Sequence, residues 1–389
     1  MLSNNLEKYK KTTDFIRTIY PGQDFVPLHA PVFFGNEKKY LNDCIDTTYV
    51  SYVGKYVTQF EEELARYLGV KYAVAVVNGT AALQIALQLI GVQKGVEVLT
   101  QSLTFVATAN AITHAGGSPI FIDSELMNFG MDPEKLEMFL NQNGERKGQG
   151  NLYNKITGNR IAACVPVHVF GHPARIDDIM YICNKWGIPV VEDAAESIGS
   201  TYNGKHMGTY GIMGILSFNG NKTITTGGGG MIVTNNEEFA LRAKHITTTA
   251  KIPHPWEFNH DEVGYNYRMT NVNAAIGCAQ MERIDLIIAN KRETAIKYAS
   301  FFKELGIQFF SEKQGCRSNY WLNTIILEDR IQRDEFLKYC NSNGIMVRPA
   351  WILMSKLPMY NKCISTGLEQ AQWLEDRIVN LPSSITQKT

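Results

Sequence analysis

From Lys71 onward, apolar runs alternate with segments of helical periodicity. Tyr72–Val77 is a continuous apolar run of the kind expected for a strand buried on both faces, and a helical pattern follows it through Leu89. Further strands are expected at 97–100, 120–123, 161–169, 189–192, 214–218 and 231–233, and further helices at 105–114, 132–141 and 176–185. This alternation predicts an α/β fold with a mainly parallel, mixed sheet and helices on its faces.

The segments outside this alternation are more polar. Residues 1–30 contain Pro21-Gly22 and Pro27 as breakers and are expected to form an N-terminal arm with little core. Residues 36–68 carry two helical patterns around a polar and aromatic loop at 47–54. Residues 142–158 are polar and contain glycines, so we expect a surface loop there, whereas Asn203-Gly204 predicts a two-residue hairpin.

The pattern changes after Gly264. A long helical pattern covers 272–305, and strand, helix and strand patterns follow at 321–327, 333–341 and 345–347. With 389 residues, the chain is long for a single core. We therefore expect an arm (1–30), a large domain (31–271) and a smaller α+β domain (272–389) carried on the long helix.

Charge and composition exclude several classes of protein. Lys+Arg and Asp+Glu are both 38, so nothing favours a nucleic-acid or acidic-membrane partner. No apolar run approaches the roughly 18 residues of a membrane span, and the N-terminus lacks the order of a signal peptide. The cysteines and histidines show no metal-ligand spacing. We expect a cytoplasmic protein without a metal site.

The stretch from Ser217 to Met231 carries the most distinctive chemistry. Lys222 lies between a strand-like approach and the four consecutive glycines 227–230. Such a lysine is well placed to meet a bound carbonyl or phosphate, because glycine lets the backbone approach a ligand closely. The alternative is a glycine-rich turn with an ordinary exposed lysine.

Four polar residues fall at or just past predicted strand ends, namely Thr80, His168, Asp193 and Lys222. Ligands gather at the carboxyl ends of parallel strands, so we expect these side chains to converge. The turn at 78–80 opens a helix and could hold an anion, although a plain N-cap is the alternative. The four glycines precede a strand rather than a helix, which counts against a dinucleotide-binding fold.

A lysine, a buried carboxylate and a helix N-terminus suit one cofactor particularly well. Pyridoxal phosphate needs a lysine for its Schiff base, a carboxylate to keep its pyridine nitrogen protonated, and N–H and hydroxyl donors for its phosphate.

Five motifs extend this match to nearly the whole chain. They are Asn78-Gly79-Thr80-Ala81-Ala82-Leu83, Thr104-Phe105-Val106-Ala107-Thr108, Glu192-Asp193-Ala194-Ala195-Glu196, Ser217 with Lys222 five residues on, and Gly264-Tyr265-Asn266-Tyr267-Arg268. On these motifs the chain resembles the DegT/StrS group of sugar-nucleotide aminotransferases. This resemblance implies an aspartate-aminotransferase-like fold of type I, with pyridoxal 5′-phosphate as cofactor.

The resemblance also implies roles for individual residues. Lys222 would bind the cofactor covalently and shuttle a proton, and Asp193 would pair with the pyridine nitrogen. Phe105 would stack on the ring, and Glu196 would lie near the 3-hydroxyl, where relatives often carry Gln or His. The other implied cofactor contacts are Gly79, Thr80, Ser217 and Asn219, with Asn266 contributed by the second subunit of a homodimer that shares its active sites.

Candidate substrate contacts are less specific. The resemblance implies that the loop Thr48, Tyr49, Val50 and Ser51 touches the nucleotide sugar, and His168, Arg268 and Arg348 are further candidates. Structural alternatives stay open for several residues. Asp193 could be a helix N-cap, Phe105 a core residue and His168 a structural strand-end residue, and both arginines could form salt bridges.

The subgroup rests on the motifs at 15–17, 20–23, 219–222 and 348–351. They resemble the aminotransferases that act at C4 of UDP-linked 4-keto-6-deoxy-N-acetylhexosamines in bacillosamine and legionaminic acid pathways, with L-glutamate as amino donor. Amination at C3, or of a GDP- or dTDP-linked sugar, is the alternative. Lys222 argues against a dehydratase, in which histidine replaces the lysine. A non-catalytic cofactor-binding regulator and a nucleotide-binding protein with a phosphate-binding lysine are further alternatives.

Overall fold

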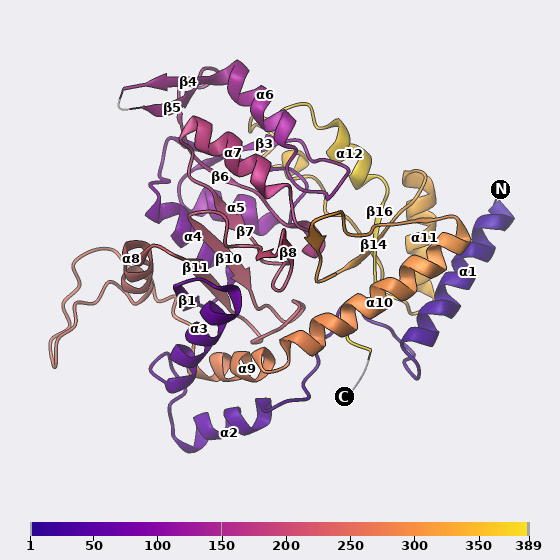
Figure 1. The fold of residues 1–389 in the computed structure, drawn as a ribbon, viewed down its shortest axis with the longest axis horizontal. Helices are drawn as coiled ribbons and strands as arrows, with labels where there is room; N and C mark the ends of the chain where they lie inside the picture. The colour runs from indigo at the N-terminus through magenta and orange to yellow at the C-terminus, as the bar shows by residue number, and fades with distance from the viewer. Residues whose placement is uncertain (1, 149, 387–389) are drawn as a thin grey trace.

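A mixed sheet forms the centre of the larger part of the molecule (Figure 1). The computed structural model describes residues 2–148 and 150–386. Strands β1, β11, β10 and β7 pair in that order, and bridges from Val167 to Asp193 and from Cys164 to Val190 continue the sheet through β6, β2 and β3. Only β11 runs antiparallel to its neighbours in this row. The strands are β1 (Tyr72–Val76), β2 (Val96–Gln101), β3 (Ser118–Ile122), β6 (Arg160–Val165), β7 (Val191–Asp193), β10 (Met213–Ser217) and β11 (Gly230–Thr234).

Helices cover both faces of this sheet, as the alternating pattern predicts. Successive strand residues point to opposite faces, so Val98 packs in one apolar cluster and Leu99 in another. One face lies against α4 (Gly79–Leu89), α5 (Val106–His114) and α8 (Glu237–Thr247). The other lies against α3 (Lys55–Leu68), α6 (Pro133–Asn143), α7 (Ile176–Trp186) and α9 (Asn271–Met281). The α/β fold with a mainly parallel sheet is confirmed.

A smaller antiparallel sheet lies at the other end of the long helix α10 (Ile284–Leu305), which crosses the molecule diagonally in Figure 1. Its strand order is β12-β14-β16-β15, with β12 at Gln308–Phe309, β14 at Asn323–Ile326, β15 at Arg348–Pro349 and β16 at Ile378–Leu381. Helices α1 (Leu2–Ile19), α10 and α11 (Arg330–Ser342) share an apolar cluster with it. Helix α12 (Glu369–Glu375) belongs to the adjoining cluster, between the two sheets.

Three expectations about local structure are wrong. The segment 1–30 contributes core, because α1 and the chain after it bury Tyr9, Ile16 and Tyr20 in the cluster that α10, α11 and the small sheet form. Residues 142–158 contain a hairpin of β4 (Gly144–Lys147) and β5 (Asn151–Asn154). The long helical pattern is divided between α9 and α10, because Arg283 leaves helical geometry with φ −117° and ψ 3°.

The remaining elements are short, apart from α2 (Glu37–Asp46), which packs against α9. The Asn203-Gly204 hairpin is confirmed: both residues have positive φ and join β8 (Thr201–Tyr202) to β9 (Lys205–His206). Strand β13 (Cys316–Arg317) pairs with β8, and two 3₁₀ turns cover Val169–Gly171 and Met354–Lys356. Among the helices of the described residues, none is long and apolar enough to cross a membrane.

Candidate active site

A cavity of about 320 Å³, here called the first cavity, lies where β7 and β10 end and α4 begins. It is lined by the predicted cofactor residues Gly79, Thr80, Phe105, Asp193, Glu196, Ser217, Asn219 and Lys222. Asn266 does not line it. Strand ends separated by more than a hundred residues therefore meet at one point, as expected for the carboxyl edge of parallel strands.

Lys222 is held inside this cavity. Its side chain is only 11% exposed, and Nζ lies 3.3 Å from the Glu196 carboxylate and 4.0 Å from the centroid of the Trp321 ring. An amine placed against a carboxylate and an aromatic face is not solvated as a surface lysine would be. The alternative of an ordinary exposed lysine is therefore wrong.

The four glycines behind Lys222 have a different role from the one expected. They do not line the first cavity. A Cβ on Gly230 would lie 2.4 Å from the carbonyl carbon of Asn78, so glycine is needed where β11 passes the turn before α4. At Gly230 the close approach is therefore to the protein's own backbone.

Asp193 ends β7 and faces the first cavity with its carboxylate held from two sides. Thr108 Oγ1 donates to Oδ2 at 2.8 Å, and the Ala195 N–H donates to Oδ1 at 3.2 Å. Thr104 in turn lies 2.9 Å from Thr108 through their hydroxyls. Asp193 precedes a turn and not a helix, so the N-cap alternative is wrong. A buried, oriented carboxylate of this kind can hold a proton on a heterocyclic nitrogen.

The other end of the first cavity presents hydrogen-bond donors. Asn78 caps α4 by accepting from the Ala81 N–H at 2.8 Å, which leaves the N–H groups of Gly79 and Thr80 without a partner in the helix. Ser217 lies beside this turn, since a Cβ on Gly79 would come within 3.0 Å of its Cβ. Free N–H groups, two hydroxyls and a helix dipole suit a phosphate.

These groups fit pyridoxal 5′-phosphate. An amine, a fixed carboxylate and a phosphate-binding helix N-terminus line one cavity, and Phe105 lies over it with half of its surface exposed. A core position for Phe105 is therefore wrong. Its exposed ring suits stacking on a planar cofactor.

Two tryptophans in this cavity were not among the predicted site residues, although Trp351 belongs to the motif at 348–351. Trp321 and Trp351 come from the chain that leads into and out of the small sheet. The indole of Trp321 donates to the Asn221 carbonyl at 2.6 Å, and the ring of Trp351 lies 6.2 Å from that of Phe105. The segments that flank the small sheet thus supply one wall of the first cavity.

Glu196 is buried between Lys222 and the backbone. Its Oε2 accepts from the Phe170 N–H at 2.8 Å, and Oε1 faces Lys222 Nζ. Burial raises the pKa of Glu196 above its ordinary value, and the nearby Lys222 opposes that shift. Glu196 can therefore exchange a proton with a neighbouring group more readily than an exposed carboxylate.

His168 does not reach the first cavity. It is fully buried: Nε2 lies 3.0 Å from Glu192, and Nδ1 accepts from the Ala174 N–H at 3.1 Å. Both ring nitrogens are engaged inside the protein, so the structural alternative holds and the substrate-contact prediction for His168 is not supported.

The other predicted substrate residues lie elsewhere. Tyr49 and Arg268 line an open groove of about 920 Å³, and Thr48, Val50 and Ser51 belong to the exposed loop beside it. Arg268 is buried and pairs with Glu61 at 2.7 Å, while its Nη1 has no partner among the described residues. The salt-bridge alternative for Arg268 is therefore correct for one of its nitrogens.

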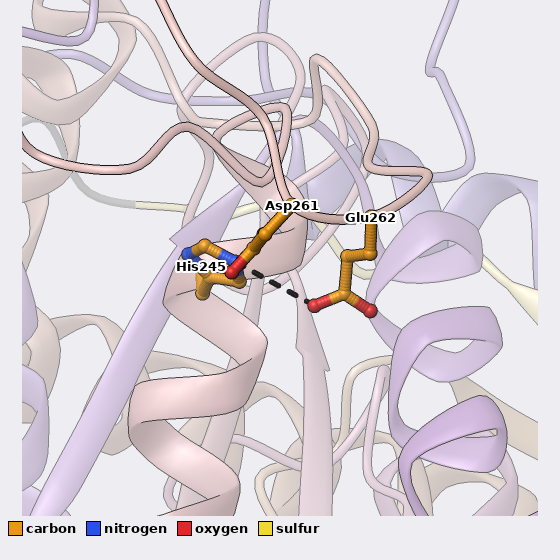
Figure 2. Close-up of side chains that lie close together, drawn as sticks. All are labelled: His245, Asp261 and Glu262. Carbon is orange, nitrogen blue, oxygen red and sulfur yellow. Dashed lines mark hydrogen bonds and ion pairs between the residues drawn. The ribbon is translucent and has the colours of Figure 1, made fainter.

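One cluster at this groove has metal-ligand residue types. His245 on α8 lies 2.7 Å from Asp261 and 3.5 Å from Glu262 (Figure 2). The guanidinium of Arg242 also binds Glu262, with Nη2 at 3.0 Å from Oε2. A cation already neutralises this carboxylate, so we interpret the cluster as an ion-pair network that fastens the loop at 251–263 to α8.

Arg348 lines a further cavity of about 420 Å³, here called the second cavity, which shares Asn221, Trp321 and Trp351 with the first. Its Nη1 donates to Asn341 at 3.0 Å and to the Val347 carbonyl at 2.9 Å. These contacts leave Nε and Nη2 available. Of the candidate substrate residues, Arg348 is thus the one that lies beside the first cavity.

Comparison with known proteins gives a consistent result. A model of the DegT/DnrJ/EryC1/StrS aminotransferase family matches residues 34–388. Two relatives named GDP-perosamine synthase, from Vibrio cholerae and Escherichia coli O157:H7, are 38% and 37% identical over 92% of this chain, and the matches cover 94% and 93% of the relatives. Helicobacter pylori PseC, an aminotransferase involved in the biosynthesis of pseudoaminic acid, has a similar structure with a TM-score of 0.83 at 22% identity, covering 92% of this chain and 93% of that one.

Proposed function

The chain belongs to the DegT/DnrJ/EryC1/StrS aminotransferase family, and on that basis we propose that it transfers an amino group from L-glutamate to C4 of a GDP-linked 4-keto-6-deoxy sugar. Membership establishes the coarser part: the protein is a pyridoxal-phosphate-dependent aminotransferase of sugar nucleotides. The donor, the nucleotide and the carbon are our proposal. The arrangement of Lys222, Asp193 and the start of α4 around one cavity carries the aminotransferase chemistry, and the names of the relatives support the nucleotide.

The comparisons change the nucleotide that we expect in the substrate. Short motifs indicated a UDP-linked substrate of the bacillosamine and legionaminic acid type. The relatives at 37–38% identity that are named for a GDP-linked product favour the alternative of a GDP-linked sugar. Identity over nine-tenths of the chain weighs more than four short motifs, so we propose GDP and keep UDP as the competitor in the assay.

The mechanism can be derived from what the chain's own residues do. When bound, pyridoxal phosphate supplies an electron-accepting ring and a carbonyl carbon that binds amines. Gly79, Thr80 and Ser217 would hold its phosphate through N–H and hydroxyl donors, and Phe105 would cover a face of its ring. Asp193, oriented by Thr108 and Ala195, would hold the proton on the pyridine nitrogen.

Lys222 moves the proton that amino transfer requires. With cofactor and substrate bound, the Nζ amine of Lys222 would be the base beside the reacting carbon. Glu196, 3.3 Å from Nζ, stabilises the charged form of the amine and can take a proton from it. Trp321, on the other side of Nζ, excludes water and keeps the lysine side chain near the cavity.

We also propose a homodimer in which Asn266 and the 48–51 loop act at the partner's site. In support, Tyr49, Val50 and Tyr52 are exposed apolar side chains along the groove, a kind of surface that commonly marks an interface. The proposal predicts complementation: co-expressed Lys222→Ala and Asn266→Ala chains form one intact site per mixed dimer. Absence of activity in purified mixed dimers would place Asn266 in the site of its own subunit.

The direct test is a comparison of acceptors. Holoenzyme is supplied with L-glutamate and either a GDP- or a UDP-linked 4-keto-6-deoxy sugar, and 2-oxoglutarate release and the amino-sugar product are measured. We expect the GDP-linked acceptor to give the higher kcat/KM. A preference for the UDP-linked acceptor would overturn the assignment of GDP as the nucleotide. Turnover of neither acceptor would overturn the proposed reaction.

A further inference from the structure

The loop at 251–263 projects from the body of the molecule beside α8 (Figure 1). All residues from 252 to 263 are exposed, and they include the large apolar side chains of Ile252, Trp256, Phe258 and Val263. Trp256 and Phe258 each expose more than three-quarters of their surface, at 76% and 78%. A group of exposed aromatic and aliphatic side chains on one projecting loop marks a surface that another molecule covers.

The loop is held in its projecting position by its own contacts. Lys251 and His260 form an antiparallel bridge, and His254 closes the tip by accepting through Nδ1 from the N–H three residues on, at 2.9 Å. The ion pairs of Asp261 and Glu262 with α8 fasten the end of the loop (Figure 2). A segment that is already ordered loses little conformational entropy when it binds. The loop is therefore prepared to present its aromatic tip to a partner.

The base of the loop belongs to the face that we propose as the dimer interface. Lys251 lines the open groove together with Tyr49 and Tyr52. Asn266, proposed above to act at the partner's site, is exposed and forms an antiparallel bridge with Thr248 at the base of the loop. The loop lies between these two bridged residues in the chain, so it must accompany Asn266 to the partner subunit.

A nucleotide sugar extends beyond the first cavity when the cofactor is also bound. That cavity, of about 320 Å³, lies near the lower end of the range for ligand sites, roughly 300–1,000 Å³. The cofactor and the reacting sugar share it, so the nucleotide lies outside. A strand rises about 3.3 Å per residue, and Trp256 is ten residues from Asn266, so the tip can lie up to about 30 Å from Asn266. This reach is sufficient to bring the tip to the nucleotide.

From this arrangement we infer that the 251–263 loop of one subunit covers the nucleotide bound to its partner, with Trp256 and Phe258 stacked on the base. The inference rests on the proposed function and its homodimer. Every nucleobase has a π-face on which an indole or phenyl ring can stack. An anionic lipid surface is the competing occupant, and the loop carries three carboxylates and one lysine, a balance that disfavours it.

The first test uses holoenzyme with Trp256→Ser, Phe258→Ser and the control Tyr181→Ser. Tyr181 is a comparably exposed aromatic residue on α7, at 71%. The mass in solution is measured by light scattering, the affinities for GDP and UDP by calorimetry, and the glutamate half-reaction by absorbance. We expect both loop variants to stay dimeric and to bind the better nucleotide about tenfold more weakly, the loss of one base–aromatic stack. The glutamate half-reaction should be unchanged in them, and all three measurements unchanged in the control.

Mixed dimers test which subunit provides the loop. In a dimer of one Trp256→Ser chain and one Lys222→Ala chain, the intact Lys222 lies in the chain that lacks Trp256. If the loop comes from the partner, this site is complete, and we expect the wild-type KM for the nucleotide sugar. A KM raised about tenfold would assign the loop to the site of its own subunit and overturn the inference.

Other outcomes overturn the inference in distinct ways. Unchanged nucleotide affinity in both loop variants would remove the loop from the acceptor site. Dissociation to monomers, with unchanged affinity in the remaining dimer, would make the loop an interface contact only. Normal nucleotide binding with loss of sedimentation on anionic lipid vesicles would assign the loop to a membrane surface. Each of these results refutes only this inference if the wild-type protein aminates a keto-sugar, whereas wild-type protein without amination refutes the proposed function itself.

Discussion

Replacing Asn319 should weaken the connection between the small domain and the active site. Its side chain is fully buried, and Nδ2 donates to the carbonyls of Glu196 and Ile198, both at 2.9 Å. Its Oδ1 accepts from the Trp321 N–H at 2.8 Å. One side chain therefore joins the loop after Asp193 to the segment that carries the tryptophan beside Lys222.

The cost of Asn319→Leu follows from these contacts. The substitution keeps the size of the side chain but leaves two carbonyls and one N–H unpaired, at about 1–3 kcal/mol each. Burial of the leucine returns about 2 kcal/mol. These terms sum to a net loss of about 1–7 kcal/mol in the free energy of unfolding, and we expect a value of about 4 kcal/mol, near the upper limit of single-residue effects.

Urea denaturation of the apoprotein, followed by circular dichroism, measures this loss. The matched control is Asn141→Leu, an exposed position on α6, which should change the free energy by less than about 0.5 kcal/mol. A loss below about 1 kcal/mol for Asn319→Leu would refute the reasoning, because relaxation or water would then satisfy all three groups.

Three further predictions concern the site and its surroundings. Thr108→Val removes the donor to Asp193 and should weaken cofactor affinity about tenfold in a fluorescence titration, and an unchanged affinity would show that Thr108 does not orient the carboxylate. Lys222→Arg should abolish transamination while leaving the thermal unfolding temperature within a few degrees of wild type, and turnover near the wild-type rate would contradict the lysine's role. Burial lowers the pKa of His172 from 6.5 to about 3, so the unfolded chain binds more protons between these values and stability falls as pH falls through that window. His172→Phe should remove this loss, about 2 kcal/mol between pH 7 and pH 5, and parallel stability curves for the two proteins would contradict it.

Those residues of the candidate site could be predicted whose positions are determined by the local sequence and the sheet topology. Thr80, Asp193 and Lys222 each follow a predicted strand, and the carboxyl ends of such strands meet at one edge. The same logic failed for His168, because the neighbouring Glu192 points to the protein interior and binds its ring. The end of a strand fixes the position of a residue's backbone, and the pleat of the strand decides to which face of the sheet its side chain points.

Other parts of the site depend on contacts that leave no local signal. Trp321 reaches the first cavity, and Asn319 the loop after Asp193, from about a hundred residues beyond Lys222, and nothing in their neighbours marks a ligand site. The break between α9 and α10 occurs at Arg283, without glycine or proline, so the helical pattern runs through it. In α1, the buried Tyr9 and Ile16 are separated mostly by polar residues, and only packing against α10, α11 and the small sheet makes them core.

The proposed mechanism depends most directly on Lys222 binding the cofactor. We would therefore record the near-ultraviolet and visible absorbance of the purified protein and of Lys222→Ala, each loaded with pyridoxal 5′-phosphate, before and after adding L-glutamate. The account predicts a visible-edge band in the wild type that glutamate shifts to shorter wavelength, and the loss of this lysine-dependent band in Lys222→Ala. A featureless wild-type spectrum after loading, or an identical band in both proteins, would contradict the assignment of Lys222 and with it the mechanism.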